Sequence, residues 1–186
     1  MPGERLYLDT EPDPVVAERH IGRYTKAIQL AAMQGGNWVD FACGSGYGTA
    51  MIADVADKVI GIDASPDAIN YARAHYPDVT FWWGGLAALE EALNLPVDAV
   101  VCVETLEHMR PVDQRQFMRV VADSGARLVL ACPIGDGPSL TNPWHVHEPT
   151  EEELHELLCV FSWYTLETEE YLSTSGPAVQ AWVVAE

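Results

Sequence analysis

Residues 39–49 read Val-Asp-Phe-Ala-Cys-Gly-Ser-Gly-Tyr-Gly-Thr, an apolar run that breaks into glycines at alternate positions before a helical pattern resumes. Glycine permits positive φ and lets backbone amides approach a ligand, and a following helix presents its first N–H groups to the ligand's negative end. The stretch therefore predicts a strand, a cofactor-binding loop and a helix. A dinucleotide fingerprint would need glycine in place of Thr49, and a P-loop would need Gly-Lys-Ser/Thr, so neither of these motifs matches.

A second carboxylate follows the next predicted strand. Residues 58–63 form an apolar run that ends in Asp63, and Ser65 and Pro66 are typical of a helix start. An acid at the tip of a second strand accepts the hydroxyls of a nucleoside ribose in folds of this kind. The alternative role for Asp63 is that of a simple helix cap.

An acidic residue before Gly-x-Gly-x-Gly resembles motif I of the class I S-adenosylmethionine (SAM) methyltransferases. The resemblance implies SAM as the cofactor. The residues that it implies for cofactor binding are Asp40, Ala42, Cys43, Gly44, Gly46, Asp63, Ala64, Gly85, Leu86, Val103, Glu104 and Tyr24. One departure concerns Gly85, because the family often carries an acidic residue there that binds the adenine amino group. We expect the N–H of Leu86, and apolar packing on Leu86 or Trp83, to hold the adenine instead.

Short apolar runs alternate with helical patterns along the chain, which predicts a parallel sheet covered on both faces. The candidate strands lie at about 37–42, 58–63, 79–84, 98–104 and 127–133, with two more at 163–170 and 179–185. The segment joining the last two is too short for a helical crossover, so they should pair antiparallel. The resemblance implies a Rossmann-like class I methyltransferase fold of the α/β class. Its sheet has seven mostly parallel strands, with the seventh strand inserted antiparallel between the fifth and sixth, and helices on both faces.

The length of 186 residues and the 48% hydrophobic content predict a single domain, 1–186. Within it, residues 1–36 form an N-terminal helical segment with a helix over 13–33, which we expect to cap the cofactor site. The residues on that helix that could close over the cofactor are Glu18, His20, Arg23 and Tyr24. The alternative is that these four are ordinary surface and core residues.

The composition and charge of the chain limit the classes of partner that we expect it to bind. A formal charge of −18 with two lysines, Lys26 and Lys58, makes nucleic acid an unlikely partner, since binding to phosphates needs cationic side chains. No stretch approaches the roughly 20 apolar residues of a membrane span, and the first residues lack the pattern of a signal peptide, so we expect a cytoplasmic protein. The cysteines form no Cys-x-x-Cys pair and are interpreted as reduced packing residues: Cys43, Cys102, Cys132 and Cys159.

A second distinctive feature follows the strand predicted at 98–104. If a helical turn starts there, Glu104, Glu107 and His108 lie at i, i+3 and i+4 on one face. Ligands of open α/β sheets bind at the carboxyl ends of the strands, so this face should lie beside the reacting methyl group. Two carboxylates and an imidazole at one point would repel unless a cation lay among them. A divalent metal meets that need.

This Glu-x-x-Glu-His sequence resembles the metal-binding motif of two methyltransferase groups. One comprises the O-methyltransferases of ubiquinone biosynthesis, and the other methylates the terminal 2′-hydroxyl of small RNAs. The resemblance to the RNA group implies a fourth ligand from the loop after the fifth strand, where His145 is the first choice and His147 the second. The implied metal ligands are Glu104, Glu107, His108 and His145, holding Mg²⁺ or Mn²⁺. Such an ion would acidify one hydroxyl of a diol or catechol, and His145 or His108 would take the proton.

Two alternatives stay open. The first is a metal-independent methyltransferase of small molecules in which His108 or His145 is the general base and Glu104 helps to bind the cofactor. The second is a SAM-binding protein that transfers no methyl group. An acidic, lysine-poor rim favours neutral or cationic acceptors over polyanions, which points to a diol, catechol or sugar and counts against RNA termini.

Overall fold

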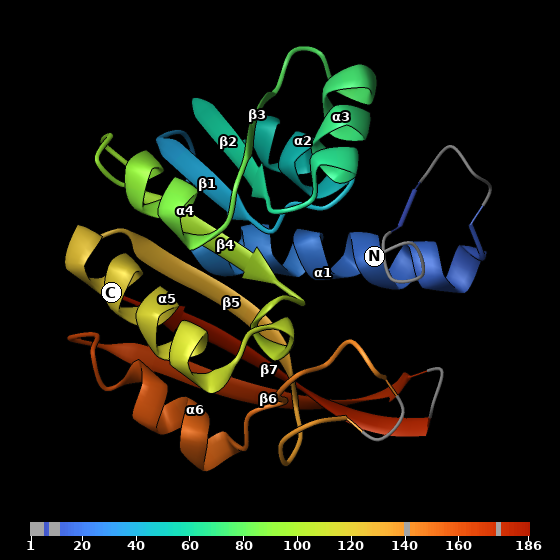
Figure 1. Cartoon of the computed structure of the whole chain (residues 1–186), viewed down its shortest axis with the longest axis vertical. Helices are drawn as coiled ribbons and strands as arrows, with labels where there is room; N and C mark the ends of the chain where they lie inside the picture. The colour runs from blue at the N-terminus through green and yellow to red at the C-terminus, as the bar shows by residue number, and fades with distance from the viewer. Residues whose placement is uncertain (1–5, 8–11, 140–141, 174–175) are drawn as a thin grey trace. The chain divides into compact units, whose positions relative to one another are not determined.

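The computed structural model describes residues 6–7, 12–139, 142–173 and 176–186 (Figure 1). The chain forms two compact units, the N-terminal unit (residues 1–101) and the C-terminal unit (residues 102–186). The seven strands follow one another in the order β3-β2-β1-β4-β5-β7-β6. This is the strand order of the class I methyltransferase fold, and it confirms that the seventh strand is inserted between the fifth and the sixth.

The strands of the N-terminal unit pair in parallel. They are β1 (Asn37–Phe41), β2 (Lys58–Asp63), β3 (Thr80–Trp83) and β4 (Ala99–Val103), the last of which continues into the C-terminal unit. Phe41 is in register with Ile62, and Asp63 with Trp83. The loops that follow β1, β2 and β3 therefore start side by side at one edge of the sheet. All five residues of β4 are buried, as expected for a strand covered on both faces.

Local signals set the helices of the N-terminal unit. They are α1 (Pro14–Ala31), α2 (Tyr47–Ala53), α3 (Pro66–His75) and α4 (Leu86–Ala92). The Asp13 carboxylate accepts from the first amides of α1, and the Ser65 hydroxyl accepts from the amide of Ala68 to cap α3. The helix start at Pro66 and the long N-terminal helix are thus confirmed, with α1 slightly shorter than expected.

The C-terminal unit contains the antiparallel part of the sheet. Its elements are a 3₁₀ turn η2 (Leu106–His108), α5 (Pro111–Ser124), β5 (Arg127–Ile134), α6 (Glu151–Leu158), β6 (Tyr164–Ser173) and β7 (Gly176–Ala185). β7 runs antiparallel to both β5 and β6. The predicted hairpin is confirmed, and both of its strands extend further toward their connection than the sequence indicated, because the pairing continues to Ser173↔Gly176.

All four cysteines are free thiols, three of them buried and Cys159 exposed. Burial raises the pKa of the Cys43 and Cys132 thiols well above the ordinary value. The interpretation as packing residues therefore fits Cys43, Cys102 and Cys132. Within the described ranges, no helix is both long and apolar enough to cross a membrane.

Candidate functional site

The loop after β1 has an unusual backbone. Ala42, Gly44 and Gly46 all have positive φ, at 62°, 57° and 88°. For Ala42 this left-handed conformation costs on the order of 1 kcal/mol, and such strain clusters at functional sites. A Cβ at Gly44 would meet nothing within 4 Å, whereas one at Gly46 would lie 2.8 Å from Ala72. The loop is therefore open at Gly44 and packed against the core at Gly46.

Gly48 differs from the expectation that it would supply positive φ. Its φ is not in the left-handed region, and a Cβ there would lie 2.1 Å from Cζ of Tyr24. Because residue 48 has no side chain, the ring of Tyr24, which lies on α1, packs directly against the backbone of α2. The third glycine of the motif is thus a packing residue that docks the first helix.

Asp40 is fully buried beneath this loop. Its Oδ2 accepts a hydrogen bond of 2.6 Å from Thr49, and its Oδ1 accepts one of 3.1 Å from Tyr24. Burial raises the pKa of Asp40 to about 7, although both hydroxyl donors oppose the shift. The sequence placed Asp40 and Tyr24 against the cofactor. The structure shows them supporting the loop from below, and their direct contact with SAM stays a prediction.

Asp63 joins two loops. Its Oδ2 accepts from the amide of Gly44 at 2.9 Å and its Oδ1 from the amide of Ser65 at 2.8 Å. The carboxylate therefore stands at the tip of β2, between the two segments that the sequence assigned to the cofactor. Asp63 thus connects the loop after β1 to the segment after β2 through its two hydrogen bonds. Ribose binding by Asp63 stays a prediction.

The remaining predicted cofactor residues of the N-terminal unit lie near the ends of β1, β2 and β3. Cys43 is buried, and its backbone N–H donates to Ile62. The carbonyl of Ala64 accepts from Nε1 of Trp83 at 3.0 Å, although the Trp83 side chain is largely exposed. Gly85 precedes Leu86, the first residue of α4, and a Cβ at Gly85 would meet nothing within 4 Å. The backbone at Gly85, where we expect the adenine, is therefore open on the side that a side chain would occupy.

His20, expected on the capping segment, contacts Tyr47 at the start of α2. Its Nδ1 lies 3.1 Å from the Tyr47 hydroxyl. Burial, with the nearby Arg23 and Arg19, lowers the pKa of His20 to about 4. His20 is therefore neutral at physiological pH.

In the C-terminal unit, the turn after β4 differs from the predicted helical face. Val103 is the buried last residue of the strand, and Glu104 follows it in the left-handed region with φ at 53°. Oε1 of Glu104 accepts a hydrogen bond of 2.8 Å from Nε2 of Gln180. The 3₁₀ turn begins only at Leu106. Glu104 is therefore outside the turn that carries Glu107 and His108, and the prediction that all three share one helical face is wrong.

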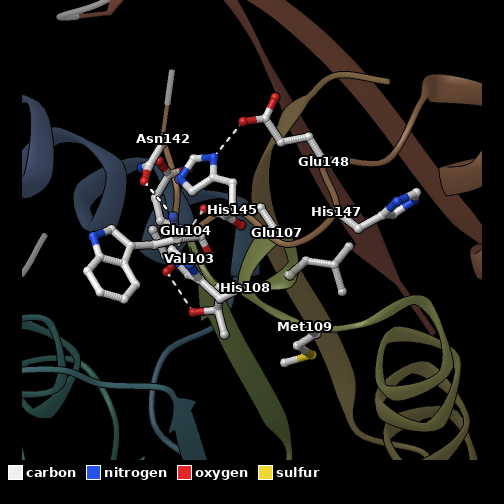
Figure 2. A network of polar contacts seen from close by, with 12 residues as sticks. Val103, Glu104, Glu107, His108, Met109, Asn142, His145, His147 and Glu148 are labelled. Atoms are coloured by element: carbon white, nitrogen blue, oxygen red, sulfur yellow. Dashed lines mark hydrogen bonds and ion pairs between the residues drawn. The ribbon is translucent and has the colours of Figure 1, made fainter. Parts of the chain in front are cut away.

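Three of the four predicted metal ligands do come together. Glu107, His108 and His145 each offer one ligand atom, and these atoms lie within 4.8 Å of one another (Figure 2). Glu107 is 1% exposed, and its Oε1 lies 3.9 Å from Nε2 of His108. The His108 and His145 rings meet nearly at right angles with their centroids 5.1 Å apart. We call these three residues the Glu-His cluster.

Each imidazole of the cluster has a hydrogen-bond acceptor beside its Nδ1. Nδ1 of His108 lies 3.0 Å from the carbonyl oxygen of Trp144, and Nδ1 of His145 lies 2.5 Å from Oε1 of Glu148. Both partners are acceptors, so each contact favours the tautomer with its hydrogen on Nδ1, which in the neutral ring leaves the lone pair on Nε2. His147, the second choice for a ligand, has its Nε2 3.2 Å from Glu153 instead.

Gln114, which the sequence did not single out, ties the turn to the loop. Its buried Nε2 donates to the carbonyls of Leu106 at 2.9 Å and of His147 at 3.0 Å. The amide of His147 also donates to the carbonyl of Glu107 at 3.1 Å. The loop after β5 is therefore fastened to the turn after β4, which holds the cluster in shape. Gln114 is the fourth residue of α5, and a single glutamine in the first turn of a helix carries no sequence signal for this role.

The N-terminal unit also contains a cavity of about 470 Å³. Asn37, Lys58 and Thr80, the first residues of β1, β2 and β3, are part of its lining. Ligands of open α/β sheets bind at the other, carboxyl ends of the strands. This cavity therefore does not bear on the cofactor loop.

Comparison with known proteins agrees with this arrangement. Residues 39–125 match the methyltransferase domain family. A probable S-adenosylmethionine-dependent methyltransferase from Mycolicibacterium smegmatis is 35% identical over 84% of this chain and 62% of its own length. A ubiquinone biosynthesis O-methyltransferase from Paracidovorax citrulli is 32% identical over 43% of this chain and 36% of its own length. The cyclopropane synthase MmaA2 from Mycobacterium tuberculosis has a TM-score of 0.73 at 14% identity, covering 95% of this chain and 87% of that one, which shows the fold alone.

The glycine loop after β1, the carboxylate at the end of β2 and the strand order define a Rossmann-like cofactor-binding protein. In its sequence matches, the chain is similar to class I SAM-dependent methyltransferases. It spans less than two thirds of the length of the Mycolicibacterium smegmatis relative.

Proposed function

We propose that this chain carries a SAM-dependent methyl transfer to a hydroxyl oxygen of a small acceptor, such as a diol, catechol or sugar. The observation that carries the proposal is the Glu-His cluster on the segments that follow β4 and β5. The predicted cofactor residues of the N-terminal unit lie at or after the ends of β1, β2 and β3. Each of these sets follows strand ends within its own unit, and ligands of α/β folds bind at the carboxyl ends of the strands. The O-methyltransferase among the relatives supports oxygen as the acceptor atom.

The chemistry is an in-line displacement. The acceptor oxygen attacks the methyl carbon of the SAM sulfonium, the carbon–sulfur bond breaks, and the sulfur keeps the electron pair to give S-adenosylhomocysteine. The hydroxyl proton needs an acceptor. Nε2 of His145 or of His108 supplies one, because each ring already donates its Nδ1 hydrogen elsewhere.

The cluster also suits a divalent metal. One carboxylate and two imidazole nitrogens within 4.8 Å form a plausible set of three protein ligands. Imidazole donors favour Mn²⁺ or a later first-row ion over Mg²⁺. When bound, such an ion would lower the pKa of an acceptor hydroxyl. We propose Glu107, His108 and His145 as its ligands, whereas Oε1 of Glu104 accepts a hydrogen bond from Gln180.

Two measurements test this proposal. The first titrates Mn²⁺ into the protein saturated with S-adenosylhomocysteine, for the wild type, Glu107→Gln and the control Glu152→Gln on the exposed start of α6. One-to-one binding that is lost only in Glu107→Gln would support the metal. No binding in any of the three would leave the histidine base as the mechanism.

The second measurement follows methyl transfer from labelled SAM to a set of catechols, diols and sugars. We expect His145→Ala to lose at least about 100-fold in rate, the usual contribution of a general base, while His155→Ala, an exposed histidine of α6, is unchanged. Binding of S-adenosylhomocysteine without transfer to any acceptor would instead favour a SAM-binding protein that is not a methyltransferase.

A further inference from the structure

Glu148 is held in a rigid position in the loop between β5 and α6. Its N–H donates to the carbonyl of Gly137 at 2.8 Å, and its carbonyl accepts from the N–H of Gly137 at 3.0 Å. The N–H of Gly135 donates to the carbonyl of Pro149 at 3.1 Å. The backbone of Glu148 is thus hydrogen-bonded to the segment that leaves β5.

Gly135 leaves the space that the Glu148 side chain occupies. A Cβ at residue 135 would lie 2.4 Å from Oε2 of Glu148 and 2.6 Å from its Cβ. The φ of Gly135 is not left-handed, so the backbone itself does not require glycine there. Glycine at this position therefore serves the placement of the carboxylate.

The carboxylate placed in this way meets His145. Oε1 of Glu148 lies 2.5 Å from Nδ1 of His145, and both side chains are mostly buried, at 18% and 16% exposed. Figure 2 shows the Glu148 carboxylate reaching the His145 imidazole, with a dashed line marking their contact. A carboxylate accepts and does not donate, so its partner nitrogen must carry the hydrogen.

We propose that Glu148 is a positioning residue that fixes His145 as the Nδ1–H tautomer and keeps the lone pair on Nε2. Without this partner the hydrogen can reside on either nitrogen, and the ring can turn. A histidine that serves as base or ligand is usually oriented by such a second hydrogen bond. What the tautomer is used for rests on the proposed function, but the tautomer itself does not.

The tautomer can be measured directly on the free protein. Protein labelled with ¹⁵N-histidine is examined by long-range ¹H–¹⁵N NMR at pH 8, and His145→Gln assigns the His145 signals. We expect Nδ1–H for His145 in the wild type and a mixture of tautomers in Glu148→Ala. Glu148→Gln should restore Nδ1–H, because its amide oxygen still accepts. His108, which donates to a backbone carbonyl, is the internal control and should not change.

A second variant distinguishes loss of the contact between Glu148 and His145 from loss of the fold. Glu148→Asp keeps the charge but shortens the side chain by one methylene, so it should behave like Glu148→Ala if the contact matters. An Nε2–H tautomer in the wild type, or an unchanged Nδ1–H in both Glu148→Ala and Glu148→Asp, would overturn the proposal.

A second experiment measures the Mn²⁺ affinity and the rate of methyl transfer of the wild type and the Glu148 variants. Loss of the orienting carboxylate should weaken metal binding or kcat by about 10- to 100-fold. The KM for SAM should stay unchanged, and Glu148→Gln should recover part of the loss. If the wild type neither binds Mn²⁺ nor transfers methyl groups, the proposed function fails, while the NMR result still decides the role of Glu148.

Discussion

The hydroxyl of Tyr24 donates a hydrogen bond of 3.1 Å to Oδ1 of Asp40, which ties the N-terminal helix α1 to the strand that carries the cofactor loop. Both side chains are buried. Burial raises the pKa of Tyr24 well above its ordinary value, and the neighbouring Asp40 adds to the shift, so the phenol stays a donor. The support of the loop therefore depends on how closely α1 approaches α2.

That approach depends on Gly48. In Gly48→Ala the new methyl group would collide with the Tyr24 ring, so we expect a loss of about 1–3 kcal/mol in the free energy of unfolding. Gly22→Ala is the matched control, because a Cβ at that exposed position of α1 meets nothing within 4 Å. It should gain about 0.5–1 kcal/mol from helix propensity. Urea unfolding measures both changes, and equal effects would contradict the packing role of Gly48.

Asp40 should make the stability of the protein depend on pH. The folded state holds the Asp40 proton up to its pKa of about 7, whereas the unfolded state releases it near the ordinary aspartate pKa of 3.8. The folded state binds more protons between these values, so this contribution to the unfolding free energy falls as pH rises through that window. The two pKa values correspond to about 4 kcal/mol at most.

His20 acts in the opposite direction, because its folded pKa of about 4 lies below the ordinary histidine pKa of 6.5. The measurement is therefore the difference in unfolding free energy between the wild type and Asp40→Asn, in which His20 is common to both. We expect the wild type to lose stability relative to the variant between pH 4 and pH 7. A difference that does not change with pH would show that Asp40 is ionised throughout.

Gln114 should matter for the shape of the Glu-His cluster. Gln114→Ala removes the donor shared by the carbonyls of Leu106 and His147, and leaving such groups unsatisfied costs about 1–3 kcal/mol each. The control is Gln116→Ala, an exposed glutamine on the same helix, which should stay within about 0.5 kcal/mol of the wild type. Thermal unfolding compares the two variants. Equal stability would mean that the loop is held by other contacts.

Much of the fold was predictable because it rests on local patterns. The apolar runs gave the strands, Ser65 and Pro66 gave the start of α3, and the short final connection gave the antiparallel hairpin. The pairing near Ser173 and Gly176 was missed, since the polar and small residues there resemble a loop and are held in the sheet by the ladder.

The site was less predictable, because side-chain direction depends on backbone angles that sequence spacing does not reveal. Spacing placed Glu104 on one face with Glu107, but its positive φ puts it outside the turn, bonded to Gln180. Glu148 lies three residues after His145, a spacing that could have suggested the contact. The use of Gly48 to admit Tyr24 involves residues far apart in the chain and had no local signal.

The most direct test concerns the loop after β1 as the site of SAM. Gly44 has positive φ and open space at its Cβ position, and so does Gly125 at the end of α5. Asparagine tolerates this conformation, so Gly44→Asn and Gly125→Asn should fold alike, while only the first places a side chain where the cofactor would lie. Calorimetric titration with S-adenosylhomocysteine should show one site in the wild type and Gly125→Asn, and at least about tenfold weaker binding in Gly44→Asn. Binding by Gly44→Asn equal to that of the control, or no binding by the wild type, would contradict the account.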